Sequence, residues 1–156
     1  MYRYSVALAV LFFTQVSTAA GVCKVAYSIA VAAGLTAQEL CDVGGIQCWS
    51  DDTRAQAICK LAGVHCWSDD GDIQAICKAA KQHCWSDEAL VSATCKIGGV
   101  HCWSDDSFAQ ALCKITGKHC WSDTTTADIL CQIRGGSFCA DADLHEEGLR
   151  VVQRCL

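Results

Sequence analysis

The chain has 156 residues, with 14 Cys, 5 Trp, 12 Gly and no Pro, and 17 acidic residues stand against 12 basic ones. This length is enough for one domain. Cysteine at this density is typical of small exported proteins that are held together by disulfides. The acidic balance and the lack of a basic stripe argue against nucleic acid and anionic lipid as partners.

Residues 1–20 have the pattern of a secretory signal peptide. Arg3 precedes a short apolar run over residues 5–13, and small residues end the segment at Ala19 and Ala20, where cleavage is expected. A transmembrane helix needs roughly 20 apolar residues, about twice this run. We therefore predict a secreted, extracellular protein with no membrane anchor in its mature chain and one Cys-rich helical repeat domain over residues 21–156. Removal of Arg3 leaves 17 acidic and 11 basic side chains, a net charge of −6.

An internal repeat of 18 residues organises the rest of the chain. Cys-Trp dipeptides recur at this spacing, at Cys48-Trp49, Cys66-Trp67, Cys84-Trp85, Cys102-Trp103 and Cys120-Trp121. A second cysteine series keeps the same period and consists of Cys23, Cys41, Cys59, Cys77, Cys95, Cys113 and Cys131. Repeats this regular predict a stacked array in which each unit packs on its neighbours.

Each unit has the signals of one short helix. After Trp49, Ser50 is the predicted N-cap, and Asp51 and Asp52 place negative charge in the expected first turn, where the helix dipole favours it. Lys60 lies near the other end, and Gly63 stands where a left-handed residue stops a helix. The predicted caps of the later units are Ser68, Ser86, Ser104 and Ser122, and the later stop signals are Gly99, Gly117 and Gly135. Lys81 replaces the glycine in one unit, which predicts a different end for that helix.

The two ends of the chain depart from the repeat. Residues 23–33 are expected to form one helix, and Thr36 with Glu39 forms a capping box for the next. Asp143 with Glu146 opens a last helix that is expected to run to about residue 153. The predicted total is about eight short helices.

The fold class that follows is all-α, a disulfide-stapled α-solenoid of about eight short helices built on the 18-residue Cys-rich repeat. The helices would form either antiparallel hairpins or one helix per coil with an extended return. A single long helix is the alternative, because 18 residues also make five turns of 3.6 and would align the cysteines on one stripe. Glycine in a helix interior costs about 1 kcal/mol, and three Gly-Gly pairs argue against it: Gly44-Gly45, Gly98-Gly99 and Gly135-Gly136.

Geometry limits the disulfide pairing. A Cys48-Cys59 bridge would span about 13 Å of helix, beyond the roughly 7 Å between α-carbons that a disulfide tolerates. A Cys59-Cys66 bridge needs only a chain reversal at Gly63. The local scheme that we prefer contains Cys41-Cys48, Cys59-Cys66, Cys77-Cys84, Cys95-Cys102, Cys113-Cys120 and Cys131-Cys139, and it leaves Cys23 and Cys155 unassigned at opposite ends of an open array. A register shifted by one unit, from Cys23-Cys48 down to Cys131-Cys155, uses all fourteen cysteines and stays open as an alternative.

Four His-Cys-Trp triplets raise the question of metal binding, through His65, His83, His101 and His119. Neighbouring helix layers are about 8 to 10 Å apart, whereas two nitrogens bound to one zinc ion lie within about 4 Å. We therefore interpret these histidines as structural or solvent-facing and predict no metal and no cofactor. Metal binding through His and Asp is retained as an alternative function.

The same triplets predict an aromatic row. In an extended triplet, alternate side chains point to opposite faces, so His65 and Trp67 share one face and Cys66 points the other way. With the cysteines directed inward, the tryptophans would form an external row flanked by the four histidines: Trp49, Trp67, Trp85, Trp103 and Trp121. The alternative is that each Trp packs against the neighbouring repeat and shields the disulfides.

No catalytic motif supports an enzyme, because the chain repeats one set of residue types where an active site needs different groups to converge. We predict a secreted non-enzymatic repeat scaffold that presents a rigid binding surface for a protein or glycan partner. Two alternatives stay open: a secreted toxin, defence or effector protein that acts on another organism, and the extracellular metal-binding protein described above.

Overall fold

A computed structural model describes residues 21–156, so the predicted signal peptide at residues 1–20 lies outside the described part of the chain. Within residues 21–156 the secondary structure is helical, without a β-strand, which confirms the all-α, disulfide-stapled class. The helices are α2 (Ala26–Ala32), α3 (Ala37–Gly44), α4 (Arg54–Ala62), α5 (Asp72–Ala79), α6 (Leu90–Gly98), α7 (Phe108–Thr116), α8 (Thr126–Ile133) and α9 (Leu144–Cys155). None of these helices combines the length and the apolarity that crossing a bilayer requires.

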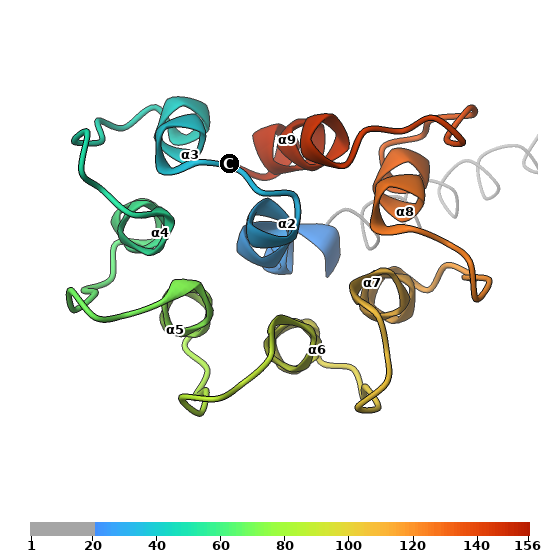
Figure 1. The fold of residues 1–156 in the computed structure, drawn as a ribbon, viewed down its shortest axis with the longest axis horizontal. Coiled ribbons are helices and arrows are strands. Elements are labelled where there is room, and N and C mark those ends of the chain that lie inside the picture. The colour runs from blue at the N-terminus through green and yellow to red at the C-terminus, as the bar shows by residue number, and fades with distance from the viewer. Residues whose placement is uncertain (1–20) are drawn as a thin grey trace, which may run out of the picture.

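The helices form a closed ring around a central helix. Figure 1 shows α3 to α9 arranged in chain order around α2. Each ring helix packs on the next, and α3 contacts α9, which closes the circle. The expectation of an open array is therefore wrong. The central helix α2 packs most extensively against α9 and also contacts α5 and α6 on the other side of the ring.

Successive ring helices are parallel, with one helix in each repeat. Arg54, the first residue of α4, donates a 2.6 Å hydrogen bond to Asp72, the first residue of α5. The starts of neighbouring helices are therefore adjacent. The central helix runs the other way, because Cys23, just before α2, is bonded to Cys155 at the end of α9. Of the two arrangements left open by the sequence, the structure has one helix per coil with an extended return.

Helices α4 to α8 begin about three residues later than predicted. Thr53 is the N-cap of α4, and it forms a capping box in which its hydroxyl accepts from the Gln56 N–H and Gln56 accepts from the Thr53 N–H. Ser107 and Thr125 cap α7 and α8 in the same way. Ser50 is thus not an N-cap, and neither are its equivalents Ser68, Ser86, Ser104 and Ser122. These serines lie in a turn that precedes each helix.

The helix ends agree with the glycine signals. Gly63, Gly99 and Gly117 are left-handed C-caps with φ near +70°. Lys81 stands at the equivalent position and adopts the same left-handed conformation, with φ +58°. Its N–H bonds the Lys78 carbonyl, just as the Gly63 N–H bonds the Lys60 carbonyl. Helix α5 nevertheless ends differently, as predicted: it stops one repeat position earlier, at Ala79, and its C-cap Ala80 is right-handed, so the left-handed residue follows the cap. Gly135 also has a positive φ, one residue beyond the cap of α8.

The two terminal segments follow the sequence signals except at Val25. The Thr36–Glu39 capping box is present, and Asp143 caps α9 by accepting from the Glu146 N–H at 2.8 Å. Residues 21–24 are helical, but Val25 interrupts the helix before α2, so residues 23–33 are not one continuous helix. The interruption lies two residues after Cys23, which meets the end of α9.

The core lies between α2 and the inner faces of the ring helices. Ile29 and Leu35 from the central segment are fully buried, as are Ile58, Leu112 and Leu130 from the ring. Small residues allow close approach between helices. A Cβ atom at Gly148 of α9 would overlap the Cβ of Ala33, which follows α2, and Cβ atoms at Gly44 and Gly98 would overlap Leu61 and Ile115 of the next ring helix. The first glycine of two Gly-Gly pairs therefore packs helices together, and the second ends the helix.

All fourteen cysteines are paired. The structure has the six local disulfides Cys41–Cys48, Cys59–Cys66, Cys77–Cys84, Cys95–Cys102, Cys113–Cys120 and Cys131–Cys139. Their α-carbons are 5.7 to 6.1 Å apart. The shifted register is therefore wrong. The seventh disulfide joins Cys23 and Cys155, the two cysteines left unassigned by the local scheme, and it links the central helix to the last helix of the ring.

Candidate binding surface

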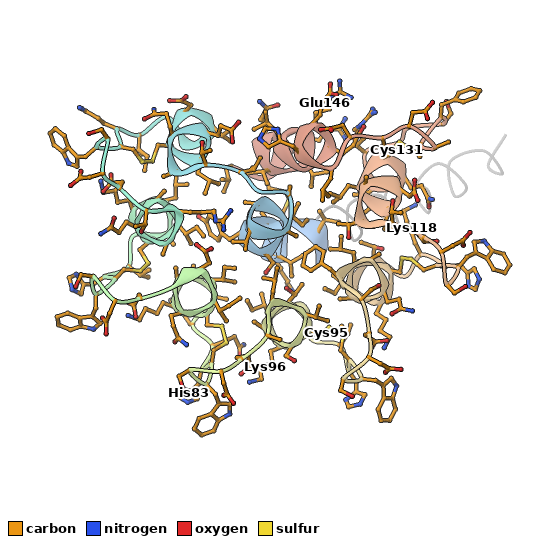
Figure 2. The ribbon with its side chains drawn as sticks, in the orientation of Figure 1. His83, Cys95, Lys96, Lys118, Cys131 and Glu146 are labelled. Carbon is orange, nitrogen blue, oxygen red and sulfur yellow. A yellow bond between two sulfur atoms is a disulfide. The ribbon has the colours of Figure 1, made fainter. Side chains whose placement is uncertain are left out.

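The segments that return from one ring helix to the next project outward and carry the tryptophans. Figure 1 shows these loops as the outermost parts of the molecule. Figure 2 shows His83 at the outer end of the loop between α5 and α6. The tryptophan rim, as we name the five indoles in these loops, is 65 to 71% exposed: Trp49, Trp67, Trp85, Trp103 and Trp121. The alternative in which each indole packs against the neighbouring repeat does not describe this structure.

Each rim tryptophan is the first residue of a tight turn, which is held by two hydrogen bonds between the tryptophan and the residue three positions later. The Trp49 carbonyl accepts from the Asp52 N–H at 3.1 Å, and the Asp52 carboxylate accepts from the Trp49 N–H at 2.8 Å. Lys60, from the body of α4, reaches outward to the same carboxylate. The later loops repeat this arrangement with Asp70 and Lys78, Glu88 and Lys96, and Asp106 and Lys114.

The second acid of the turn is therefore not a first-turn helix charge, as predicted, but the centre of the loop. The hydrogen bond from Lys60 lowers the pKa of Asp52, and the bond from the Trp49 N–H acts in the same direction. The pKa values of Asp70, Glu88 and Asp106 are lowered in the same way, first by the lysine of their own repeat. The first acid of each turn is exposed and has no ion pair among the described residues: Asp51, Asp69, Asp87, Asp105 and Asp123.

The fifth loop differs, because Thr124 replaces the acid. Its hydroxyl accepts from the Trp121 N–H at 3.0 Å, and the Trp121 carbonyl accepts from the Thr124 N–H at 3.1 Å. The turn is therefore kept without a carboxylate. No lysine braces this loop, since Gln132 stands eight residues after Thr124 where the other units have lysine. The loop is a natural internal control for the role of the ion pair.

The histidines orient the indoles. His65 and Trp67 contact each other edge to face, with ring centroids 4.8 Å apart and planes at 90°. The same contact recurs at His83–Trp85, His101–Trp103 and His119–Trp121, at 4.7 to 4.9 Å. His and Trp therefore share one face of the extended triplet. In residues 21–156, no three side chains of His, Cys, Asp or Glu lie close enough to hold a metal ion.

A groove of about 550 Å³ separates the loop before α5 from the loop after it. Asp69, Asp70 and Asp72 line one wall, and His83 and Trp85 line the other. Gln74 of α5 donates a 3.1 Å hydrogen bond to the Trp85 carbonyl, which ties the second wall to the helix. The groove thus combines carboxylates and an indole from two successive repeats.

A further exposed aromatic side chain lies outside the predicted tryptophan row. Phe138, in the loop between α8 and α9, is 94% exposed. It directly precedes Cys139, at the place that histidine takes before the Cys-Trp cysteines. That position in the repeat was the available signal. Every loop from α3 to α9 therefore carries an exposed aromatic residue.

The structure does not bring the rim tryptophans together. Neighbouring helix axes are about 9 Å apart, and the loops lie outside the ring, so successive indoles are separated by roughly 15 to 20 Å on this geometry. A compact ligand therefore contacts one indole, or one groove between two loops. The fourteen cysteines, in contrast, are brought into pairs that hold each loop to its own helix.

These features define a class of protein: a disulfide-stapled, all-helical repeat in which parallel helices surround a central one and the connecting loops display exposed aromatic residues. Comparison with protein-family models, with curated proteins and with solved structures finds no match to this chain.

Proposed function

We propose that this protein is a secreted, non-enzymatic scaffold that binds a protein or glycan partner through its tryptophan rim. The observation that carries the proposal is the nearly uniform exposure of the five indoles, at 65 to 71%. The pairing of all fourteen cysteines supports an oxidising, extracellular setting.

The indoles contribute little to the fold. Burial of apolar surface stabilises a protein by roughly 25 cal/mol per Å², and about two thirds of each indole stays in water. The turn around each tryptophan uses its backbone N–H and carbonyl, which any residue other than proline supplies. Tryptophan is therefore not needed for the loop to form, whereas it is the residue type that most often dominates binding energy at interfaces.

The loops are also rigid before any partner binds. The Cys59–Cys66 disulfide, the Asp70 turn and the Lys78 ion pair restrain the loop around Trp67, and the contact with the His65 ring restrains the indole itself. A restrained side chain loses less conformational entropy on binding than a free one. This supports a recognition role for the rim.

The separation of the indoles supports a partner with repeated features or several partner copies. Weak sites that are linked on one rigid body bind such a partner with an avidity 10² to 10⁴ times that of one site, by order of magnitude. A polymer with a short repeat and a surface that carries many copies of one protein both meet this requirement.

The experiment is a binding screen with the oxidised protein, residues 21–156, on immobilised extracellular proteins and polysaccharides. A variant with all five tryptophans changed to alanine should lose binding at least tenfold and keep its helical circular dichroism. The matched control changes the exposed lysines Lys24 and Lys81 to alanine, which leaves the five indoles in place. Equal binding by the five-alanine variant and the parent protein would refute the proposal.

A further inference from the structure

We propose that the groove between the loops flanking α5 is a binding site for a cationic side chain, arginine or lysine, of a protein partner. The proposal deepens the proposed function, on which it rests, by naming the partner chemistry. The groove is lined by Asp69, Asp70 and Asp72 on one side and by His83 and Trp85 on the other.

Two of the three carboxylates that line the groove are in ion pairs, and the third is not. Asp70 is paired with Lys78, and Asp72 accepts two hydrogen bonds from Arg54. Asp69 is exposed and has no ion pair among residues 21–156. The groove therefore has one unpaired carboxylate in its lining, on the wall opposite the Trp85 indole.

The indole on one wall and the unpaired carboxylate on the other both attract cationic groups. A guanidinium or ammonium group is attracted to the face of an indole and gains about 0.5 to 2 kcal/mol there, with tryptophan the best of the aromatic rings. The carboxylate of Asp69 adds charge-assisted hydrogen bonding, for which arginine has the favourable planar geometry. The Trp85 side chain is 65% exposed and oriented by His83 at 4.9 Å, so its ring is available without rearrangement.

The groove is open because Gly71 lacks a side chain. A Cβ atom built on Gly71 meets no other atom within 4 Å, so the space beside it is free. The same position in other repeats holds Thr53, Ala89, Ser107 and Thr125, which place a side chain there. Gly71 gives up the side-chain cap that α4, α7 and α8 possess. The weaker cap at α5 and the open groove therefore have one cause.

Charge complementarity favours a basic protein over a glycan. The chain without residues 1–20 has 17 acidic and 11 basic side chains, a net charge of −6. This charge attracts a cationic partner and speeds its association. It repels acidic polysaccharides, and it contributes nothing to the capture of a neutral sugar.

The test measures the binding of an acetylated and amidated tetra-arginine peptide to the oxidised protein by calorimetry. The variants are Trp85→Ala, Asp69→Asn and Gly71→Thr, and the matched control is Trp121→Ala, which removes an equally exposed indole from a distant loop. Trp85→Ala should weaken binding about 5- to 10-fold. Gly71→Thr restores the cap of α5, so it should keep or raise the melting temperature, and by filling the groove it should also weaken binding about fivefold or more. Trp121→Ala should change the affinity less than twofold.

Two further measurements separate this inference from the proposed function. Raising the salt concentration from about 50 to 500 mM should weaken tetra-arginine binding, because screening shortens the range of the Asp69 charge. A neutral polysaccharide that binds the parent protein but not the five-alanine variant, with no binding of tetra-arginine, would overturn the cationic site and leave the rim function intact. Equal tetra-arginine affinity of the parent protein, Trp85→Ala and Gly71→Thr would also overturn it.

Discussion

The disulfide between Cys23 and Cys155 should stabilise the fold more than any local disulfide, because it closes the largest loop. It joins residues 132 apart in sequence, whereas the local bridges join residues 7 or 8 apart. The local bridges bypass part of the chain, so the loop that Cys23–Cys155 closes contains about 100 freely jointed residues, for which the chain-entropy relation gives about 4.7 kcal/mol. The same relation gives about 2.5 kcal/mol for a loop of about 8 residues.

The double variants Cys23→Ala/Cys155→Ala and Cys59→Ala/Cys66→Ala make the comparison. Cys23 is exposed and Cys155 half-buried, so their removal costs little packing. Cys59 is buried, so the local variant loses about 1 kcal/mol of sulfur packing besides the entropy term. The expected losses in the free energy of unfolding are about 4.7 kcal/mol for the ring-closing pair and about 3.5 kcal/mol for the local pair.

Equilibrium unfolding in guanidinium chloride, followed by circular dichroism with the other disulfides oxidised, measures both losses. The denaturant slope m is the second readout, because it rises when the unfolded chain becomes more expanded. Removal of Cys23–Cys155 should raise m, and removal of Cys59–Cys66 should leave it nearly unchanged. A smaller loss of stability for the ring-closing pair, with the same m for both variants, would refute the entropic reasoning.

Three further predictions follow from single positions. Lys81→Gly should stabilise the protein by about 1 kcal/mol, because it removes a side chain from a left-handed conformation, and Lys81→Ala should give no such gain in thermal unfolding. Gly148→Ala should destabilise it by about 1 to 2 kcal/mol, since the overlap with Ala33 outweighs the better helix propensity; adding Ala33→Gly should recover most of the loss. The turn acids Asp52 and Asp106 have lowered pKa values in the folded protein. Their contribution to the stability of the folded state is therefore complete above the unfolded carboxyl pKa of about 4 and is lost as the pH falls through the folded pKa. In single-tryptophan variants, Trp103 fluorescence should therefore change on acidification below pH 4, and Trp121 fluorescence should change less because Thr124 has no charge to lose.

Features that depend on a few neighbouring residues were predictable from the sequence. Gly63 and its equivalents end their helices with positive φ, as expected for left-handed caps. The local disulfides follow from the length of one helix and one chain reversal, since Cys59 and Cys66 lie on either side of the turn at Gly63. The shared face of His65 and Trp67 follows from the alternation of an extended strand of chain.

The helix starts were mispredicted because two capping signals compete in each unit. Ser50 with its two acids resembles an N-terminus, but Thr53 and Gln56 form a complete capping box three residues later. The later signal is not repeated in every unit, since Gly71 and Ala89 stand at the equivalent positions. The Ser-Asp signal, in contrast, recurs in all five Cys-Trp units, but it marks the turn that carries the exposed tryptophan.

Ring closure was not predictable, because it depends on a small rotation between neighbouring helices that accumulates over the repeats. No pair of adjacent residues encodes this rotation. Small residues at helix contacts contribute to it, such as Gly44 against Leu61 and Gly98 against Ile115.

The size of the ring explains why the central helix packs unevenly. Seven helices spaced about 9 Å apart lie on a circle of radius about 10 Å, at the upper limit of the 8 to 10 Å at which two helices pack. One helix inside such a circle does not reach all seven neighbours equally. The asymmetry is present in the structure: α2 packs most extensively against α9, where Gly148 permits close approach, and the disulfide Cys23–Cys155 joins the same two helices. Helices α2 and α9 therefore form a pair that fixes the central helix to the ring. The repeats between α3 and α9 are held by the contact that closes the ring as well as by their own disulfides.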